Sequence, residues 1–179
     1  MQHLGLLSIL SIFAIIGYVL HAARHKNLRT ISHHAASSRR LLVGYTVSIT
    51  LALTVFSYWV LRWFRHELQL PDIYTVLFTF ALVAMTFVIL IPTKKGLQSH
   101  IHDGFAFLLG SCFLPLIFIA SRSENVSSTA QIISYVILAF MIGAILNSGS
   151  RIRNDAVFLR MQKTYFTLFL LTFLVFTYF

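Results

Sequence analysis

Acidic residues are scarce in this sequence, and cysteine is nearly absent. Only five Asp and Glu residues accompany fourteen Lys and Arg residues among 179 positions, which gives a formal net charge of +9. Charged residues make up 11% of the chain, whereas soluble domains average about 25%, and apolar residues make up 58%. This composition excludes an ordinary soluble domain. The single cysteine, Cys112, excludes an intrachain disulfide. Cysteine usage therefore indicates neither an oxidising nor a reducing compartment.

Ionisable residues are also missing from the middle of six long apolar stretches. About 20 helical residues cross a hydrocarbon core about 30 Å thick, and backbone within lipid must satisfy its own hydrogen bonds. The alternation of apolar and polar residues that marks a barrel strand is absent. We therefore predict an all-α protein, a six-helix transmembrane bundle formed by a single polytopic membrane domain, 1–179. The predicted spans cover approximately residues 4–21, 41–62, 73–91, 104–121, 131–147 and 161–179.

The charges divide unevenly between the two faces that these spans define. The first, third and fifth connections carry eleven Lys and Arg residues against Asp103 and Asp155, and so hold the entire net charge of +9. The second and fourth connections carry three Arg residues against three acidic residues and cancel. Because short positive loops stay in the cytoplasm, this bias predicts cytoplasmic odd-numbered connections and termini that lie outside.

The absence of charge in mid-span bears on function. Proton-coupled transporters usually place ionisable groups near the membrane midplane, and channels often line their pores with them. A small transporter is therefore disfavoured, and any chemistry is expected at an interface.

Small residues inside the spans, such as Thr50, Thr54, Ala139 and Gly143, predict close helix packing. A stripe of phenylalanines in the last span predicts packing or lipid contact rather than a cofactor site: Phe166, Phe169, Phe173 and Phe176.

The basic, histidine-rich face of connections one, three and five holds the candidate ligand-binding residues. Lys and Arg side chains near a membrane surface attract anionic lipid by about 1 kcal/mol each, and guanidinium forks suit phosphate. The competing interpretation is that the basic residues only orient the chain, and that Asp103 caps the fourth span. The candidate residues are Ser32, His33, His100, His102, Asp103, Arg151, Arg153 and Arg160.

A metal or haem centre is the alternative hypothesis for this face. His33, His102 and Asp103 offer the nitrogen and carboxylate ligands that zinc prefers, and a metal-dependent membrane hydrolase would use a bound water as its nucleophile. A haem-bearing redox subunit would need two axial histidines, such as His21 and His102, and the sequence has no C-x-x-C-H pattern for covalent attachment. The leading prediction includes no catalytic residues and no cofactor.

Short motifs at these connections resemble a known family. They are Leu28-Arg29-Thr30-Ile31-Ser32-His33, Leu90-Ile91-Pro92-Thr93 followed by His100 or His102, Phe107 with Leu114-Pro115-Leu116, and Phe158-Leu159-Arg160. With the span count, they resemble a bacterial six-transmembrane-helix family of unknown function related to the DRAM/FRAG/Sfk membrane proteins. The resemblance implies lipid organisation, sterol or phosphoinositide handling, or autophagy, without an established catalytic mechanism. It also implies an N-terminus inside the cell, the reverse of the charge-based orientation, so both orientations stay open.

These observations predict an integral protein of the bacterial cytoplasmic membrane that serves in lipid-associated binding or scaffolding. Its expected partners are membrane lipids, anionic ones in particular, and not nucleic acid. Its working surface would be the basic, histidine-rich face of connections one, three and five. The sequence specifies neither the ligand nor the oligomeric state.

Overall fold

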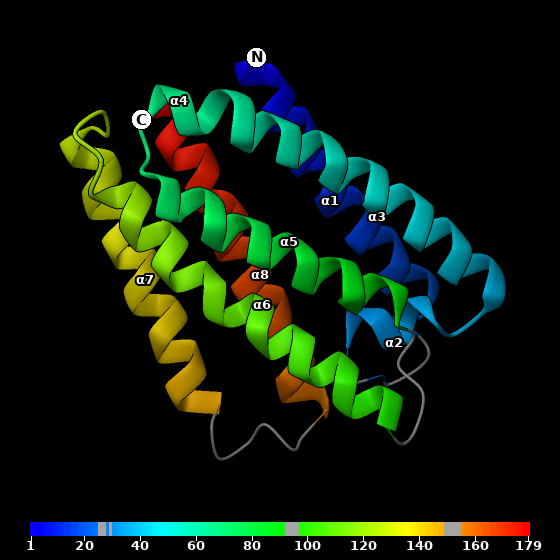
Figure 1. Cartoon of the computed structure of the whole chain (residues 1–179). Helices are drawn as coiled ribbons and strands as arrows, with labels where there is room; N and C mark the ends of the chain where they lie inside the picture. The colour runs from blue at the N-terminus through cyan, green and yellow to red at the C-terminus, as the bar shows by residue number, and fades with distance from the viewer. Residues whose placement is uncertain (25–27, 29, 92–96, 149–154) are drawn as a thin grey trace.

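The chain folds into a bundle of antiparallel helices in a computed structural model that describes residues 1–24, 28, 30–91, 97–148 and 155–179. Within these residues there is no β-strand, so the predicted all-α class is confirmed. The long helices alternate in direction along the chain (Figure 1). The elements are α1 (Gln2–Ala22), α2 (Ile31–Ala35), α3 (Arg39–Trp59), a π-helical turn η1 (Val60–Phe64), α4 (Arg65–Glu67), α5 (Asp72–Leu90), α6 (Leu97–Ser121), α7 (Ser128–Ser148) and α8 (Asp155–Tyr178).

Five of the described helices are long and apolar enough to cross a membrane. They are α1, the continuous run of α3, η1 and α4, then α5, the part of α6 from His100, and α7. The chain is therefore compatible with a multi-pass integral membrane protein. The sixth long helix, α8, has 24 residues but is not among these candidates. Gln162, Lys163 and several threonines interrupt its apolar sequence.

Some helix boundaries differ from the predicted spans. The helix that starts with α3 continues to Glu67, and α6 begins at Leu97, several residues before the predicted span. His100, His102 and Asp103 therefore lie within α6 rather than in the preceding loop. The interpretation that Asp103 caps this helix is wrong, because a capping residue must flank the first turn. The short helix α2 was not predicted.

Aromatic side chains form the middle of the core. Phe113 of α6 stacks on Phe169 of α8 with ring centroids 3.7 Å apart. Phe173, one turn further along α8, meets Phe56 of α3 edge-on at 5.0 Å and Phe64 of η1 at 4.9 Å. Aromatic pairs in such geometries add to the stabilisation from burial. The phenylalanine stripe of the last helix therefore packs into the core, as predicted.

Gly5 of α1 lies directly against the side chain of Trp59 in α3. A Cβ at this position would overlap the ring of Trp59 in α3, which is completely buried. Gly5 thus leaves room for the indole ring of Trp59 to pack against α1, and small residues allow such close packing between membrane helices. Among the small residues that the sequence predicted to pack, four are instead exposed: Thr50, Thr54, Ala139 and Gly143.

The alternating directions give the bundle two distinct ends. At one end lie α2, the end of α1, the start of α3, the start of α6, the end of α7 and the start of α8, and we call this the basic end (Figure 1). At the opposite end lie both termini, α4 and the turn before α7 (Figure 1). There, the Gln2 side-chain amide donates a hydrogen bond to the carbonyl oxygen of Thr177 at 2.7 Å and joins the two terminal helices.

Candidate functional site

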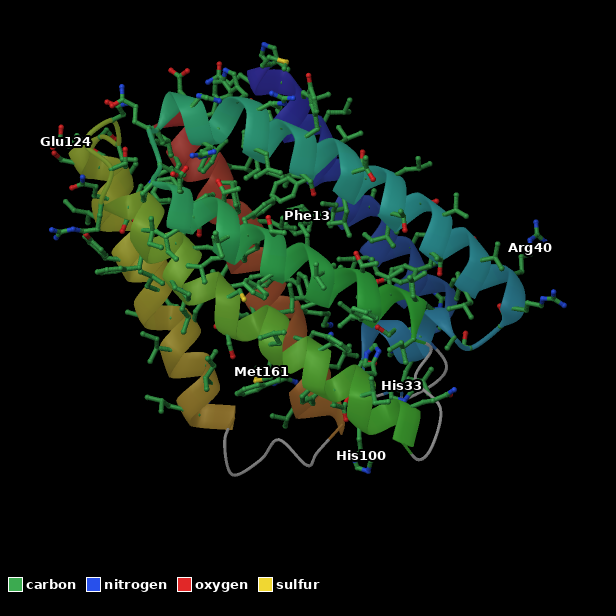
Figure 2. All side chains as sticks on the ribbon, in the orientation of Figure 1. Phe13, His33, Arg40, His100, Glu124 and Met161 are labelled. Atoms are coloured by element: carbon green, nitrogen blue, oxygen red, sulfur yellow. The ribbon has the colours of Figure 1, made fainter. Side chains whose placement is uncertain are left out.

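The short helix α2 organises the predicted residues of the first connection at the basic end. Thr30 caps it, because its hydroxyl oxygen accepts a hydrogen bond from the backbone N–H of His33 at 3.1 Å. The same oxygen lies 2.8 Å from Nδ1 of His33. His34 Nδ1 lies 2.8 Å from the carbonyl oxygen of Thr30, and a carbonyl only accepts, so this nitrogen carries the hydrogen. Figure 2 shows His33 at the basic end.

Gln162 ties α2 to α8. The backbone N–H of Ile31 donates to Gln162 Oε1 at 3.1 Å, which satisfies one of the amides that a helix N-terminus leaves without an internal partner. Ser32 is only 7% exposed. Ser32 and Gln162 both line a cavity of about 50 Å³ inside the bundle. Ser32 thus borders the interior rather than the aqueous surface. Gln162 is not among the site residues that the sequence predicted. An amide side chain near the start of an otherwise apolar helix could have indicated it.

His102 links α6 to the end of α5. It is 1% exposed, and its Nδ1 donates a hydrogen bond to the carbonyl oxygen of Ile91 at 3.0 Å. Ile91 follows the last residue of α5, where carbonyl groups lack partners within the helix. The other ring nitrogen, Nε2, is buried and has no hydrogen-bond partner among the described residues. His102 therefore caps α5 and retains one unsatisfied acceptor.

The remaining predicted residues of α6 and α8 are more exposed. His100 lies two residues before His102, about 200° around the helix, and is exposed. Its side chain points away from the bundle at the basic end (Figure 2). Asp103 is half-buried and Arg160 is exposed. The candidate residues thus divide between the interior and the surface, while Arg151 and Arg153 lie outside the described residues.

The described cations of the basic end are exposed. None forms an ion pair with an acidic side chain in the described part of the chain. At the opposite end, by contrast, Arg65 pairs with Asp72. Arg40, at the start of α3, extends away from the bundle (Figure 2). These exposed cations are Arg24, Arg39, Arg40, Arg160 and Lys163.

The structure gives the metal-site hypothesis no support. Over the described residues, no three His, Cys, Asp or Glu side chains come together as a potential metal site. His33 is engaged with Thr30, and His102 with Ile91. The alternative ligand set of His33, His102 and Asp103 therefore remains a prediction from the sequence.

Fold and site together define an all-helical bundle that is compatible with a multi-pass membrane protein and that carries exposed cations at one end. No protein-family model matches the chain, and no curated protein or solved structure matches it significantly. The resemblance to relatives of the DRAM/FRAG/Sfk proteins therefore stays a prediction. Functional inference must come from the chain's own residues.

Proposed function

We propose that this chain is a six-span integral membrane protein that binds anionic lipid at its basic end. In this proposal, α8 crosses the membrane beside the five more apolar helices. The basic end faces the cytoplasm of a bacterial cell. The observation that carries the proposal is the set of exposed arginines and Lys163 without acidic partners among the described residues.

The packing of α8 supports its role as a sixth span. Phe169 and Phe173 of α8 are 5% and 3% exposed, within the aromatic core that α3 and α6 share. A helix of 24 residues is about 36 Å long at 1.5 Å per residue, which exceeds the hydrocarbon thickness. Lys163 is exposed near its first turns, where a long side chain can extend to the interface.

Electrostatics favours a lipid phosphate at the basic end. A Lys or Arg near the membrane surface contributes about 1 kcal/mol to the attraction of anionic lipid, provided that no nearby carboxylate neutralises it. The pair of Arg65 and Asp72 illustrates such neutralisation at the opposite end. Arginine also binds phosphate through two parallel hydrogen bonds. The two ends of the molecule should therefore differ in headgroup preference.

Paired charge removals at the two ends test this proposal. We expect Arg39→Gln with Arg160→Gln to weaken phosphatidylglycerol binding by about 2 kcal/mol, or roughly thirtyfold. The matched control, Arg62→Gln with Arg122→Gln, removes two exposed cations at the opposite end and should change binding less than threefold. The measurement is native mass spectrometry of the purified protein titrated with phosphatidylglycerol or phosphatidylcholine.

Equal loss of binding in the two double variants would contradict the proposal. So would equal affinity of the unmodified protein for the two lipids. Metal analysis and an absorption spectrum of the same preparation test the enzyme alternative, because stoichiometric zinc or a Soret band would favour a hydrolase or a redox subunit.

A further inference from the structure

The cavity of about 50 Å³ has walls from six helices, α1, α2, α3, α5, α6 and α8. Apart from Ser32 and Gln162, its lining consists of Ala, Ile, Leu, Val, Met, Phe and Tyr side chains. Tyr45 and Met85 in this lining are only 6% and 7% exposed. Lipid around the outside of the bundle therefore barely reaches the inner wall.

The cavity is long and narrow. Its lining residues run from Gln162 to Leu170 along α8 and from Phe78 to Val88 along α5. At 1.5 Å per residue, these stretches measure about 12 Å and about 15 Å. A cavity needs at least about 10–15 Å³ to hold one water, so a volume of about 50 Å³ spread over this length leaves room for a single row of small groups. A fused ring system is too wide.

Polarity changes along the cavity. Ser32 of α2 and Gln162 near the start of α8 are its polar lining residues at the basic end. Farther into the bundle, the wall consists of aromatic and aliphatic side chains, including Phe56 and Phe169. The cavity therefore has a polar end beside the exposed cations and an apolar end near the aromatic core.

We propose that this cavity holds one acyl chain of a membrane lipid whose headgroup lies at the basic end. That the lipid is anionic rests on the proposed function. Water does not occupy an apolar cavity stably, and lipid chains are the material that surrounds a membrane-spanning bundle. A chain inside would restore the dispersion contacts that an empty space forfeits.

Photo-crosslinking of the full chain tests this proposal. The protein is placed in vesicles of phosphatidylglycerol and phosphatidylcholine that contain a trace of either lipid with a diazirine in mid-chain. After irradiation, modified residues are identified by peptide mass spectrometry. We expect adducts on buried Tyr45 and Met85, besides adducts on lipid-facing residues such as Phe107 and Leu146, which are 79% and 75% exposed.

A cavity-filling variant provides the matched comparison. Ala81 lines the cavity and is 5% exposed, so Ala81→Phe should reduce adducts on Tyr45 and Met85 at least tenfold and leave those on Phe107 unchanged. Ala139→Phe, on the exposed face of α7, should leave both sets unchanged. If Ala81→Phe does not fold, Ala81→Leu fills less of the space and should give a smaller reduction of the same adducts.

The two lipid probes separate this proposal from the proposed function. Buried adducts mainly from the phosphatidylglycerol probe would support both. Equal buried adducts from both probes would support the chain site and contradict the headgroup preference. Adducts confined to exposed residues in the unmodified protein, or buried adducts that persist in both Ala81 variants, would overturn the chain site.

Discussion

Histidine side chains at the basic end act through backbone hydrogen bonds. His34 and His102 each donate from Nδ1 to a carbonyl oxygen, at 2.8 Å and 3.0 Å, and both are buried. The Thr30 carbonyl also accepts the backbone N–H of His34 at 3.1 Å, so the His34 ring adds a second bond there. The bond from His102 gives the Ile91 carbonyl a partner in an apolar surrounding, where an unmet hydrogen bond is costly. Nε2 of His102 is buried and has no hydrogen-bond partner among the described residues, so it is available to a ligand.

Substitution of His102 tests its capping role. We expect His102→Ala to lower the free energy of unfolding by about 1–3 kcal/mol, because the Ile91 carbonyl loses its partner, and to lower Tm by roughly 2–10 °C. His102→Asn should retain most of the stability, because its side-chain amide can donate from nearly the position of Nδ1. Thermal unfolding of the purified protein measures both variants. If Asn were as damaging as Ala, the important atom would be Nε2, and a ligand role would gain support.

The short helix α2 depends on contacts with its neighbours. It has only five residues, and isolated helices of this length do not persist in water. Its N-cap at Thr30 and the bond from Ile31 to Gln162 hold it against α8. This small element carries Ser32 and His33, so its attachment positions two of the predicted site residues.

Loss of the Gln162 carbonyl oxygen should loosen α2. We expect Gln162→Leu to speed hydrogen exchange at the Ile31 amide by roughly two- to tenfold, because a typical hydrogen bond contributes about 0.5–1.5 kcal/mol. Gln162→Glu keeps an acceptor oxygen and should exchange at nearly the original rate. Hydrogen–deuterium exchange of peptides that cover 30–38 measures the difference. Unchanged exchange in Gln162→Leu would show that the bond does not hold the element.

The helical elements were largely predictable from apolar runs, and the contacts between them were not. Composition and run length predicted the five most apolar helices, because hydropathy is a local property of the sequence. The start of α6 at Leu97 was missed, since Gln98 and His100 are polar yet helical. Gly5 packs on Trp59 while Gly143 is exposed, and no spacing rule distinguishes the two. Which small residue meets a neighbour depends on the rotation of each helix.

For the site, residue types were predictable and their surroundings were not. Residues two apart on a helix point in different directions, and His100 is exposed while His102 is buried. The role of His102 as a cap of α5 depends on a contact eleven residues away in sequence, which a periodicity argument does not reveal. Gln162 and Tyr45 acquire importance only because the bundle encloses a cavity between them and Ser32.

At the scale of the whole molecule, the alternating directions of the helices decide which connections lie together. With six crossings, the ends of α1, α3, α5, α6, α7 and α8 that border the odd-numbered connections share one membrane face. The cations there are exposed, and the narrow cavity has its polar lining at the same end. A shared face is therefore the condition for both lipid proposals.

Sided labelling of single cysteines measures this arrangement most directly. In a Cys112→Ala background, His100→Cys and Lys163→Cys report on the basic end, and Glu124→Cys and Phe179→Cys on the opposite end, at exposed positions. A membrane-impermeant maleimide should label His100→Cys and Lys163→Cys from the cytoplasmic side, and Glu124→Cys and Phe179→Cys from the other side. Labelling of Lys163→Cys and Phe179→Cys from the same side would contradict the account, because α8 would then not cross the membrane.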